Sequence, residues 1–368
     1  AENSLLEYSL GPIRLGSPLI AEYDSGVLLQ SNGIIGNYYR IRLDRNSEGY
    51  IHRRFVETLP EGTPRPSYYI QAVSPSSSKG EDVIRIPYPQ NVPYAVHPDP
   101  EQKQIRISLF GVKTSSTWIV HKTFTKFIER ISWEQVTPET YQVVLHLATS
   151  KIWGYTLRPE GTSLVFRLKH PPRLESGDSA SVLKGLKVAL EAGHGGKSTG
   201  AIGLSGLPEK EINLNLARRL EQLCLSEGME ILQVRDRDVT MPLYAKRQIV
   251  ESSDADLFIS IHANAGNTSR GYLGVAGTST YYHNPFWSAF AERVYDHLLD
   301  LDLEEFGVVG SFNYTVTRMS SRPAILVEQA FLSHAMDEEK LASPDFRQAM
   351  AEKILEGIKA YVAYMMEE

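Results

Sequence analysis

An apolar run that leads directly into a glycine-rich turn is the feature that most constrains this chain of 368 residues. Residues 186–192 read Leu-Lys-Val-Ala-Leu-Glu-Ala, and His194 follows among Gly193, Gly195 and Gly196. Short apolar runs that end at glycine are typical of strands buried inside a parallel sheet. We therefore expect His194 at the carboxyl end of a strand, which is where open α/β sheets bind their ligands.

Strand and helix patterns alternate from this turn to the end of the chain. Ile212, Leu216 and Leu220 form one face of a predicted helix, and the apolar run over 256–261 predicts a second buried strand. Alternation of this kind is typical of a layered α/β fold. It predicts an α/β domain over 185–368 with a mostly parallel sheet flanked by helices.

The first half of the chain shows strand patterns only. Apolar and charged residues alternate over 39–44, and residues 1–60 as a whole predict a small β barrel. Residues 84–172 contain several half-buried strand patterns about ten residues apart, which indicates a β sandwich. Polar stretches at 61–83, rich in proline and serine, and at 173–184 are predicted to be linkers. The fold class expected is an α/β domain preceded by two small all-β domains.

Charge and cysteine content exclude several functional classes. Residues 1–184 contain 21 Lys and Arg against 18 Asp and Glu, whereas residues 185–368 contain 17 against 26. The acidic second half argues against a nucleic-acid partner, because neutralisation of phosphates drives that binding. Cys224 is the only cysteine, so neither an intramolecular disulfide nor a cysteine zinc site can form. No run of 18 apolar residues occurs, which predicts that the chain has no transmembrane segment.

Three residues with catalytic or metal-binding chemistry lie at predicted strand ends. His194 follows the first strand, His262 follows Leu257-Phe-Ile-Ser-Ile, and Glu328 follows Ala324-Ile-Leu-Val. The carboxyl ends of parallel strands meet at one edge of a sheet, so these side chains are expected to converge. Two histidines and a carboxylate with an open position for water form a known hydrolytic zinc arrangement.

The third ligand of such a metal would be an acidic residue close to His194. Glu209 is the best placed, because Pro208 before it suits the first turn of a helix. Glu191 and Glu211 are competitors, and position alone does not choose among the three.

A phosphate-binding loop is the main alternative reading of the glycine-rich turn. Gly196-Lys-Ser matches the end of the motif Gly-x-x-x-x-Gly-Lys-Ser/Thr, but position 191 holds glutamate where the motif requires glycine. A carboxylate at Glu191 would repel the phosphates, so the metal reading is favoured. The motifs Gly-x-Ser-x-Gly and His-Glu-x-x-His do not occur, which removes the usual signatures of serine hydrolases and helix-borne zinc proteases.

Five motifs in the second half of the chain support one family resemblance. They are Glu191-Ala-Gly-His-Gly-Gly-Lys, Leu207-Pro-Glu-Lys-Glu-Ile-Asn-Leu, Val234-Arg-Asp-Arg-Asp, Leu257-Phe-Ile-Ser-Ile-His-Ala-Asn-Ala and Pro323-Ala-Ile-Leu-Val-Glu-Gln-Ala-Phe-Leu-Ser. In this order they resemble the zinc-dependent N-acetylmuramoyl-L-alanine amidases of bacterial cell-wall turnover. The resemblance covers about 185–366.

The resemblance implies a role for each residue that matches a family motif. It implies that His194, Glu209 and His262 are the zinc ligands and that Glu328 is the catalytic carboxylate. It also decides for Glu209 over the neighbouring acid at position 211.

Other positions are expected around this ligand set. Glu191 and Ala330 depart from the family, which usually has Asp and Gly there. Glu191 is expected next to a ligand. Asn264 and Arg318 are expected either in the substrate groove or in surface or packing roles.

The same resemblance implies a substrate and a location. The expected reaction is hydrolysis of the amide between the lactyl group of N-acetylmuramic acid and L-alanine of the stem peptide, with peptidoglycan as partner and Zn²⁺ as cofactor. The expected location is the bacterial cell envelope, after export and removal of a signal peptide. Residues 1–60 resemble a bacterial Src-homology-3-like barrel and residues 84–172 resemble an AMIN domain, which implies targeting to peptidoglycan or other cell-wall polymers.

Two other functions remain open from the sequence. The chain could be a non-catalytic cell-wall-binding protein, or a zinc peptidase that cuts within the stem peptide.

Overall fold

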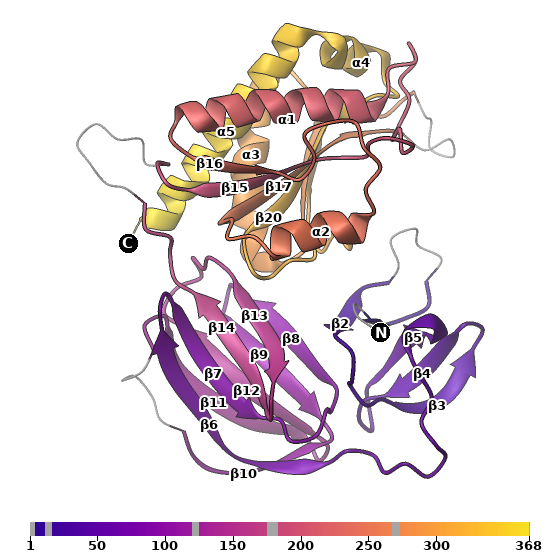
Figure 1. The fold of residues 1–368 in the computed structure, drawn as a ribbon, viewed down its shortest axis with the longest axis vertical. Coiled ribbons are helices and arrows are strands. Elements are labelled where there is room, and N and C mark those ends of the chain that lie inside the picture. The colour runs from indigo at the N-terminus through magenta and orange to yellow at the C-terminus, as the bar shows by residue number, and fades with distance from the viewer. Residues whose placement is uncertain (1–3, 12–16, 120–124, 175–182, 267–272, 368) are drawn as a thin grey trace. The chain divides into compact units, whose positions relative to one another are not determined.

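The computed structural model describes residues 4–11, 17–119, 125–174, 183–266 and 273–367 (Figure 1). The chain divides into two compact units, Ala1–His170 and Pro171–Glu368. None of the described helices is both long enough and apolar enough to cross a membrane.

The N-terminal unit begins with an antiparallel sheet of five strands in the order β2-β1-β5-β4-β3. Its strands are β1 (Ser4–Glu7), β2 (Leu19–Tyr23), β3 (Gln30–Ile35), β4 (Tyr38–Arg42) and β5 (Glu48–His52), and a short 3₁₀ helix, η1 (Arg53–Phe55), follows. Leu6, Ile41 and Ile51 are buried. A Cβ at Gly49 would lie 2.8 Å from Ile20 Cδ1 and 3.0 Å from Leu6 Cδ1, so a larger residue there would require these two side chains to shift.

Two further sheets complete this unit, and Figure 1 shows them lying one over the other. The first has the order β10-β6-β7-β14-β13 and the second the order β11-β12-β9-β8. Their strands are β6 (Tyr68–Ser78), β7 (Glu81–Pro87), β8 (Tyr94–Asp99), β9 (Gln104–Phe110), β10 (Val112–Ile119), β11 (Ile128–Thr137), β12 (Thr140–Leu147), β13 (Tyr155–Glu160) and β14 (Ser163–Lys169). Both sheets bury alternate apolar residues, such as Ile84 and Phe166 in the first and Ile107 and Val143 in the second.

The predicted linker over 61–83 differs from the structure, because β6 and the start of β7 lie within it. Tyr68, Ile70 and Val73 of β6 are buried, and the serines that follow pair with β7. Proline and serine content suggested a loop, but the apolar residues of β6 determine the local structure. Most of the other predicted linker, residues 175–182, lies outside the described part of the chain.

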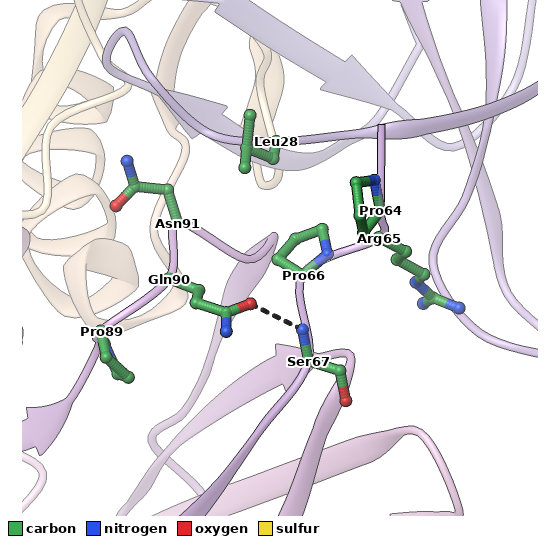
Figure 2. A pocket seen from close by; sticks show the side chains of 8 residues that line it. All are labelled: Leu28, Pro64, Arg65, Pro66, Ser67, Pro89, Gln90 and Asn91. Atoms are coloured by element: carbon green, nitrogen blue, oxygen red, sulfur yellow. Dashed lines mark hydrogen bonds between the residues drawn. The ribbon is translucent and has the colours of Figure 1, made fainter. Parts of the chain in front are cut away.

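A cavity of about 470 Å³ lies among three loops of the N-terminal unit (Figure 2). It is lined by Leu28, Pro64, Arg65, Pro66, Ser67, Pro89, Gln90 and Asn91. Gln90 accepts a hydrogen bond from the backbone N–H of Ser67 at 2.8 Å, and Arg65 pairs with Glu139 at 3.3 Å. These lining residues include no histidine and no carboxylate.

The C-terminal unit is built around a six-stranded sheet in the order β16-β15-β17-β20-β18-β19. Its strands are β15 (Lys187–Ala192), β16 (Glu230–Gln233), β17 (Leu257–Asn264), β18 (Thr278–Tyr282), β19 (Glu305–Val309) and β20 (Ala324–Phe331). The first four strands of this order run parallel, whereas β18 is antiparallel to β20 and parallel to β19.

Helices cover both faces of this sheet, with α1 and α5 over one face and α2 over the other (Figure 1). The helices are α1 (Glu209–Ser226), α2 (Leu243–Glu251), α3 (Ser288–Leu298), α4 (Ala335–Ala342) and α5 (Pro344–Met366), with 3₁₀ helices η3 (Pro285–Trp287) and η4 (Leu299–Leu301). Because both faces are covered, almost every residue of β15 and β17 is buried. The predicted fold class is confirmed: a mostly parallel α/β unit follows all-β sheets.

We predict that truncating the centre of this sheet destabilises the C-terminal unit. Phe258 on β17 is 0% exposed, so Phe258→Ala is expected to lower the free energy of unfolding by about 3–5 kcal/mol. Leu225 on α1 is 48% exposed, and Leu225→Ala should change it by less than about 0.5 kcal/mol. Chemical denaturation measures both variants, and equal losses would contradict the assigned core.

Candidate metal centre

The turn after β15 needs glycine for its backbone conformation. His194, Gly195 and Gly196 have φ angles of 62°, 128° and 59°, so three successive residues lie in the region of positive φ. A Cβ at Gly195 would lie 2.4 Å from the carbonyl oxygen of Val239, and that atom cannot move aside easily. The two glycines therefore let the chain reverse tightly while His194 remains at the end of the strand.

The backbone N–H groups of this turn are already hydrogen-bonded within the protein. The N–H of Gly196 donates to Asp238 Oδ1 at 2.6 Å, and the N–H of Lys197 donates to Thr240 Oγ1 at 2.8 Å. A phosphate-binding loop requires such groups to point at the ligand. The structure thus agrees with the rejection of a phosphate loop on the basis of Glu191.

Arg235 connects the turn to the start of α1. Its guanidinium donates to the carbonyl oxygens of Ala192 at 2.8 Å, Gly193 at 2.9 Å and Lys210 at 2.8 Å. The side chain is 2% exposed, so these carbonyl groups take the place of water around a buried cation. Arg235 therefore fixes His194 and Glu209 relative to each other. In the sequence, Arg235 stood out only as a member of the motif Val234-Arg-Asp-Arg-Asp, and no role was predicted for it.

Three of the predicted site residues form one donor group. One ligand atom each from His194, Glu209 and His262 lies within 4.8 Å of the others. Glu209 Oε2 is 3.0 Å from His194 Nε2, and Glu209 Oε1 is 2.9 Å from His262 Nδ1. A tetrahedral ion with ligand bonds of about 2.0–2.1 Å separates its ligand atoms by about 3.3 Å. The chemistry of the donor set therefore fits a divalent metal.

Backbone groups hold the carboxylate of Glu209 in this position. The N–H of Ala201 donates to Oε2 at 2.9 Å and the N–H of Ala263 donates to Oε1 at 3.2 Å. Asn213, one helical turn further along α1, donates to Oε1 at 3.1 Å. Glu211, the competitor in the sequence, is exposed on α1 and is not a member of the donor group.

Glu191 lies buried beneath His262. It is 0% exposed and contacts the ammonium of Lys246 on α2 and the hydroxyl of Ser260. Its Oε2 is 3.7 Å from Nε2 of His262, the ring nitrogen that faces away from Glu209. A carboxylate behind a metal-binding histidine fixes the orientation and tautomer of the ring. The structure thus places Glu191 next to His262, a candidate ligand.

Opposite charges dominate the protonation of this cluster in the metal-free protein. Burial alone would lower the pKa of His262, but its interactions with Glu191 and Glu209 outweigh burial and raise that pKa to about 10. Burial alone would raise the pKa of Glu191, yet His262 and Lys246 lower it to about 2. A positive charge is therefore favoured between the two carboxylates, and a metal ion would replace the proton on His262.

Glu328 lies on the strand next to His262. The two residues are opposite each other in the parallel pairing of β17 and β20, so their side chains project from the same face. Glu328 is half-buried, unlike its fully buried neighbours Val327 and Gln329. It therefore lies beside the donor group without belonging to it.

The two predicted groove residues have different surroundings. Asn264 ends β17 and donates to the hydroxyl of Tyr281 at 3.3 Å. Arg318 donates to Thr315 Oγ1 at 2.7 Å, within the segment that leads into β20. The structure thus brings Asn264 to the strand of His262, and it shows a local contact for Arg318.

Tyr314 is a site residue that the sequence analysis missed. Its ring is perpendicular to the ring of His262, with centroids 5.9 Å apart. The ring of Phe312 is tilted by 51° against the ring of Tyr281, with centroids 4.6 Å apart, so this loop covers one side of the candidate site. No spacing signal in the sequence distinguishes these aromatics from core residues.

We predict that the buried ion pair is essential for stability. Lys246→Met leaves the carboxylate of Glu191 without its ammonium partner, which should lower the free energy of unfolding by about 3–5 kcal/mol. Lys353, whose ammonium is partly exposed and pairs with Asp300 and Glu356, provides a matched control. Lys353→Met should cost less than about 1 kcal/mol.

Denaturation of the metal-free variants measures this difference. Combining Lys246→Met with Glu191→Gln should recover part of the loss, since no unpaired charge remains buried. A similar cost for the two lysine variants would contradict the role of the pair.

Comparison with known proteins identifies similar sequences over this unit. Residues 188–360 match the family described as N-acetylmuramoyl-L-alanine amidase. The chain is 32% identical over 182 residues to the N-acetylmuramoyl-L-alanine amidase LytC of Bacillus subtilis, covering 48% of this chain and 36% of LytC. It is 30% identical over 180 residues to the sporulation-specific N-acetylmuramoyl-L-alanine amidase of the same organism, covering 47% of this chain and 67% of that protein.

A solved structure also matches this unit. The catalytic domain of CwlV, an N-acetylmuramoyl-L-alanine amidase from Bacillus (Paenibacillus) polymyxa var. colistinus, is 32% identical, with a TM-score of 0.46. The match covers 48% of this chain and 98% of that domain.

Proposed function

The chain belongs to the N-acetylmuramoyl-L-alanine amidase family through its second half, and on this premise we propose that it is a zinc-dependent peptidoglycan hydrolase. The bond cleaved is the amide between the lactyl group of N-acetylmuramic acid and L-alanine of the stem peptide. The observation that supports this best is the donor group of His194, Glu209 and His262 at the carboxyl edge of the sheet, with Glu328 on the adjacent strand.

Zinc is the metal that we propose for this donor group. Two imidazole nitrogens and one carboxylate oxygen are a zinc donor set, whereas Mg²⁺ and Ca²⁺ prefer oxygen ligands. When bound, zinc would lower the pKa of water toward about 7 and polarise the substrate carbonyl. The half-buried imidazole of His194 leaves one side of the group accessible to a large substrate.

Glu328 is the residue that we assign to proton transfer. Its carboxylate accepts a proton from the attacking water as the water oxygen bonds to the amide carbon. The carbon–nitrogen bond then breaks, and Glu328 returns the proton to the nitrogen of L-alanine. Glu191 holds the ring of His262 during these steps, and Arg235 holds the turn of His194.

Two alternatives use the same residues differently. A zinc peptidase that cuts within the stem peptide would need the same donors and base, and family membership favours the amidase. A non-catalytic wall-binding protein would not need a half-buried carboxylate beside the donor group, so Glu328 supports catalysis. The products distinguish these possibilities, because only an amidase releases a peptide that begins with L-alanine.

The N-terminal unit is proposed to bind the cell wall. Residues 1–60 as a Src-homology-3-like barrel and residues 84–172 as an AMIN-like sandwich remain our assignment of its two parts. The cavity in Figure 2 is a candidate contact for peptidoglycan or other wall polymers, because amide and backbone groups meet proline rings there. We further propose that the protein acts in the bacterial cell envelope after export and removal of a signal peptide.

We predict that Glu328→Gln separates zinc binding from catalysis. The variant keeps the three donors, so its zinc content should equal that of the wild type. Its rate of peptide release from purified sacculi should fall by about 10²–10⁴-fold, since the amide side chain cannot accept the proton. Metal analysis and mass spectrometry of the released fragments measure the two properties.

Variants of the proposed ligands provide the complementary control. His194→Ala and His262→Ala should lose both zinc and activity, and removal of zinc from the wild type by a chelator should abolish release reversibly. Full activity in Glu328→Gln would exclude it as the base. Fragments that begin within the stem would favour the peptidase.

We also predict that the N-terminal unit binds sacculi by itself. The fragment 1–170 has its own buried cores and is expected to pellet with purified sacculi. Heat-denatured fragment is the control for non-specific adsorption. The experiment uses bare sacculi and sacculi that carry other wall polymers. If the folded fragment stays entirely in the supernatant with both, a targeting role is excluded.

A further inference from the structure

Three adjacent strands bring polar side chains to one face of the sheet around Glu328. In the backbone pairing, Glu328 on β20 lies opposite His262 on β17 and opposite Ser279 on β18. Residues paired in this way project from the same face, and Tyr281 shares that face with Ser279 because side chains alternate along a strand. The proposed base therefore lies between a candidate metal ligand and a pair of hydroxyl groups.

A hydrogen bond crosses over the strand that carries Glu328. β17 and β18 flank β20, and Asn264 on the first donates to the hydroxyl of Tyr281 on the second at 3.3 Å. Asn264 pairs with Phe331 and Tyr281 pairs with Leu326. Along β20, Glu328 therefore lies between the two positions that these residues flank. The bond therefore spans the face from which Glu328 projects.

The direction of the hydrogen bonds around Tyr281 leaves its own proton to donate. The side-chain oxygen of Asn264 accepts from the N–H of Ala265 at 2.9 Å, which turns its amino group toward Tyr281. Ser279 Oγ also donates to the tyrosine hydroxyl, at 3.2 Å. Two donors occupy the two lone pairs of the phenol oxygen, so the phenol O–H is available to donate to a further group.

The electrostatics of the phenol agree with this role. Burial, aided by the negative charge of Glu328, raises the pKa of Tyr281 to about 12, although the hydrogen bonds from Ser279 and Asn264 oppose the shift. The hydroxyl therefore stays protonated at neutral pH. The contact between the rings of Tyr281 and Phe312 accounts for the aromatic ring but not for the hydroxyl.

We propose that Tyr281, held by Ser279 and Asn264, is a positioning residue whose hydroxyl donates a hydrogen bond to the carboxylate of Glu328 and fixes it for proton transfer. The inference rests on the proposed function, in which Glu328 is the base. It assigns the hydroxyl network on β18 to the reaction, and it gives Asn264 a part in holding the base rather than the substrate.

Tyr281→Phe in the full-length, zinc-loaded protein tests this inference, because it keeps the ring contact and removes the hydroxyl. We expect kcat for peptide release from sacculi to fall about 10- to 100-fold, since misplacing a catalytic group slows its reaction by this order. KM and the zinc affinity measured by competition with a chelator should stay within about twofold of the wild type, because Tyr281 contacts no member of the donor group in our assignment. Tyr282→Phe, the adjacent half-buried residue on the opposite face, is the matched control and should retain kcat.

A cycle with Glu328→Gln tests whether Tyr281 acts through the base. The double variant should have the same residual kcat as Glu328→Gln alone, because a positioning residue has no effect when the group it positions is lost. An unchanged kcat in Tyr281→Phe overturns the inference. The inference is also overturned if Tyr281→Phe lowers kcat by the same factor in the wild type and in Glu328→Gln.

Crystal structures of the zinc-loaded wild type and Tyr281→Phe provide a measurement that does not depend on activity. A displaced or multiply oriented Glu328 carboxylate in the variant supports the inference, whereas an unchanged carboxylate overturns it. A wild type that releases no peptide would disprove the proposed function, and the crystallographic comparison would still decide the positioning role.

Discussion

The carboxylate of Glu209 is the interaction on which the candidate site depends. It joins three separate parts of the chain: its own helix α1, the turn that carries His194, and the end of β17 that carries His262. Backbone N–H groups of Ala201 and Ala263 direct both oxygens toward the histidines. A 4% exposed carboxylate is costly to bury, so each of these contacts is needed to compensate for its lost hydration.

The rest of the C-terminal unit supplies what Glu209 needs. Parallel strands place the ends of β15 and β17 side by side, and the buried cations Arg235 and Lys246 hold the chain behind each histidine. Arg235 does so through carbonyl groups and Lys246 mainly through Glu191. Two buried charged side chains, Arg235 and Lys246, thus hold the backbone and the carboxylate behind the donor group, and this keeps the donors in place.

Much of this arrangement could be predicted from the sequence, because strand ends at one edge of a parallel sheet must meet. That rule predicts that His194, His262 and Glu328 lie together. The expected strand ends were too early, because β17 continues past His262 to Asn264 and β20 continues past Glu328 to Phe331. The rule did not separate Glu209 from Glu211, since both follow Pro208. On a helix, residues two apart are rotated by about 200° around the axis and so lie on nearly opposite sides, which means that only one of the two can face the histidines. Deciding which one required either the family resemblance or the structure.

The sequence could not reveal contacts between distant charged or polar residues. Lys246 and Arg235 look like surface residues until the fold buries them, and β6 looks like a linker because four of its eleven residues are serine. Interactions of this kind depend on where the elements meet rather than on local periodicity.

The reversed direction of β18 is the clearest example of such a dependence. Ligand sites of open α/β sheets lie beyond the carboxyl ends of the parallel strands. Because β18 is antiparallel to β20, it enters the sheet at that same edge, and its first residues lie beside Glu328. A parallel strand would instead bring its last residues there. The change of direction therefore places a short hydroxyl-rich segment, Thr278–Tyr282, beside the proposed base, although nothing in that segment alone indicates a catalytic role.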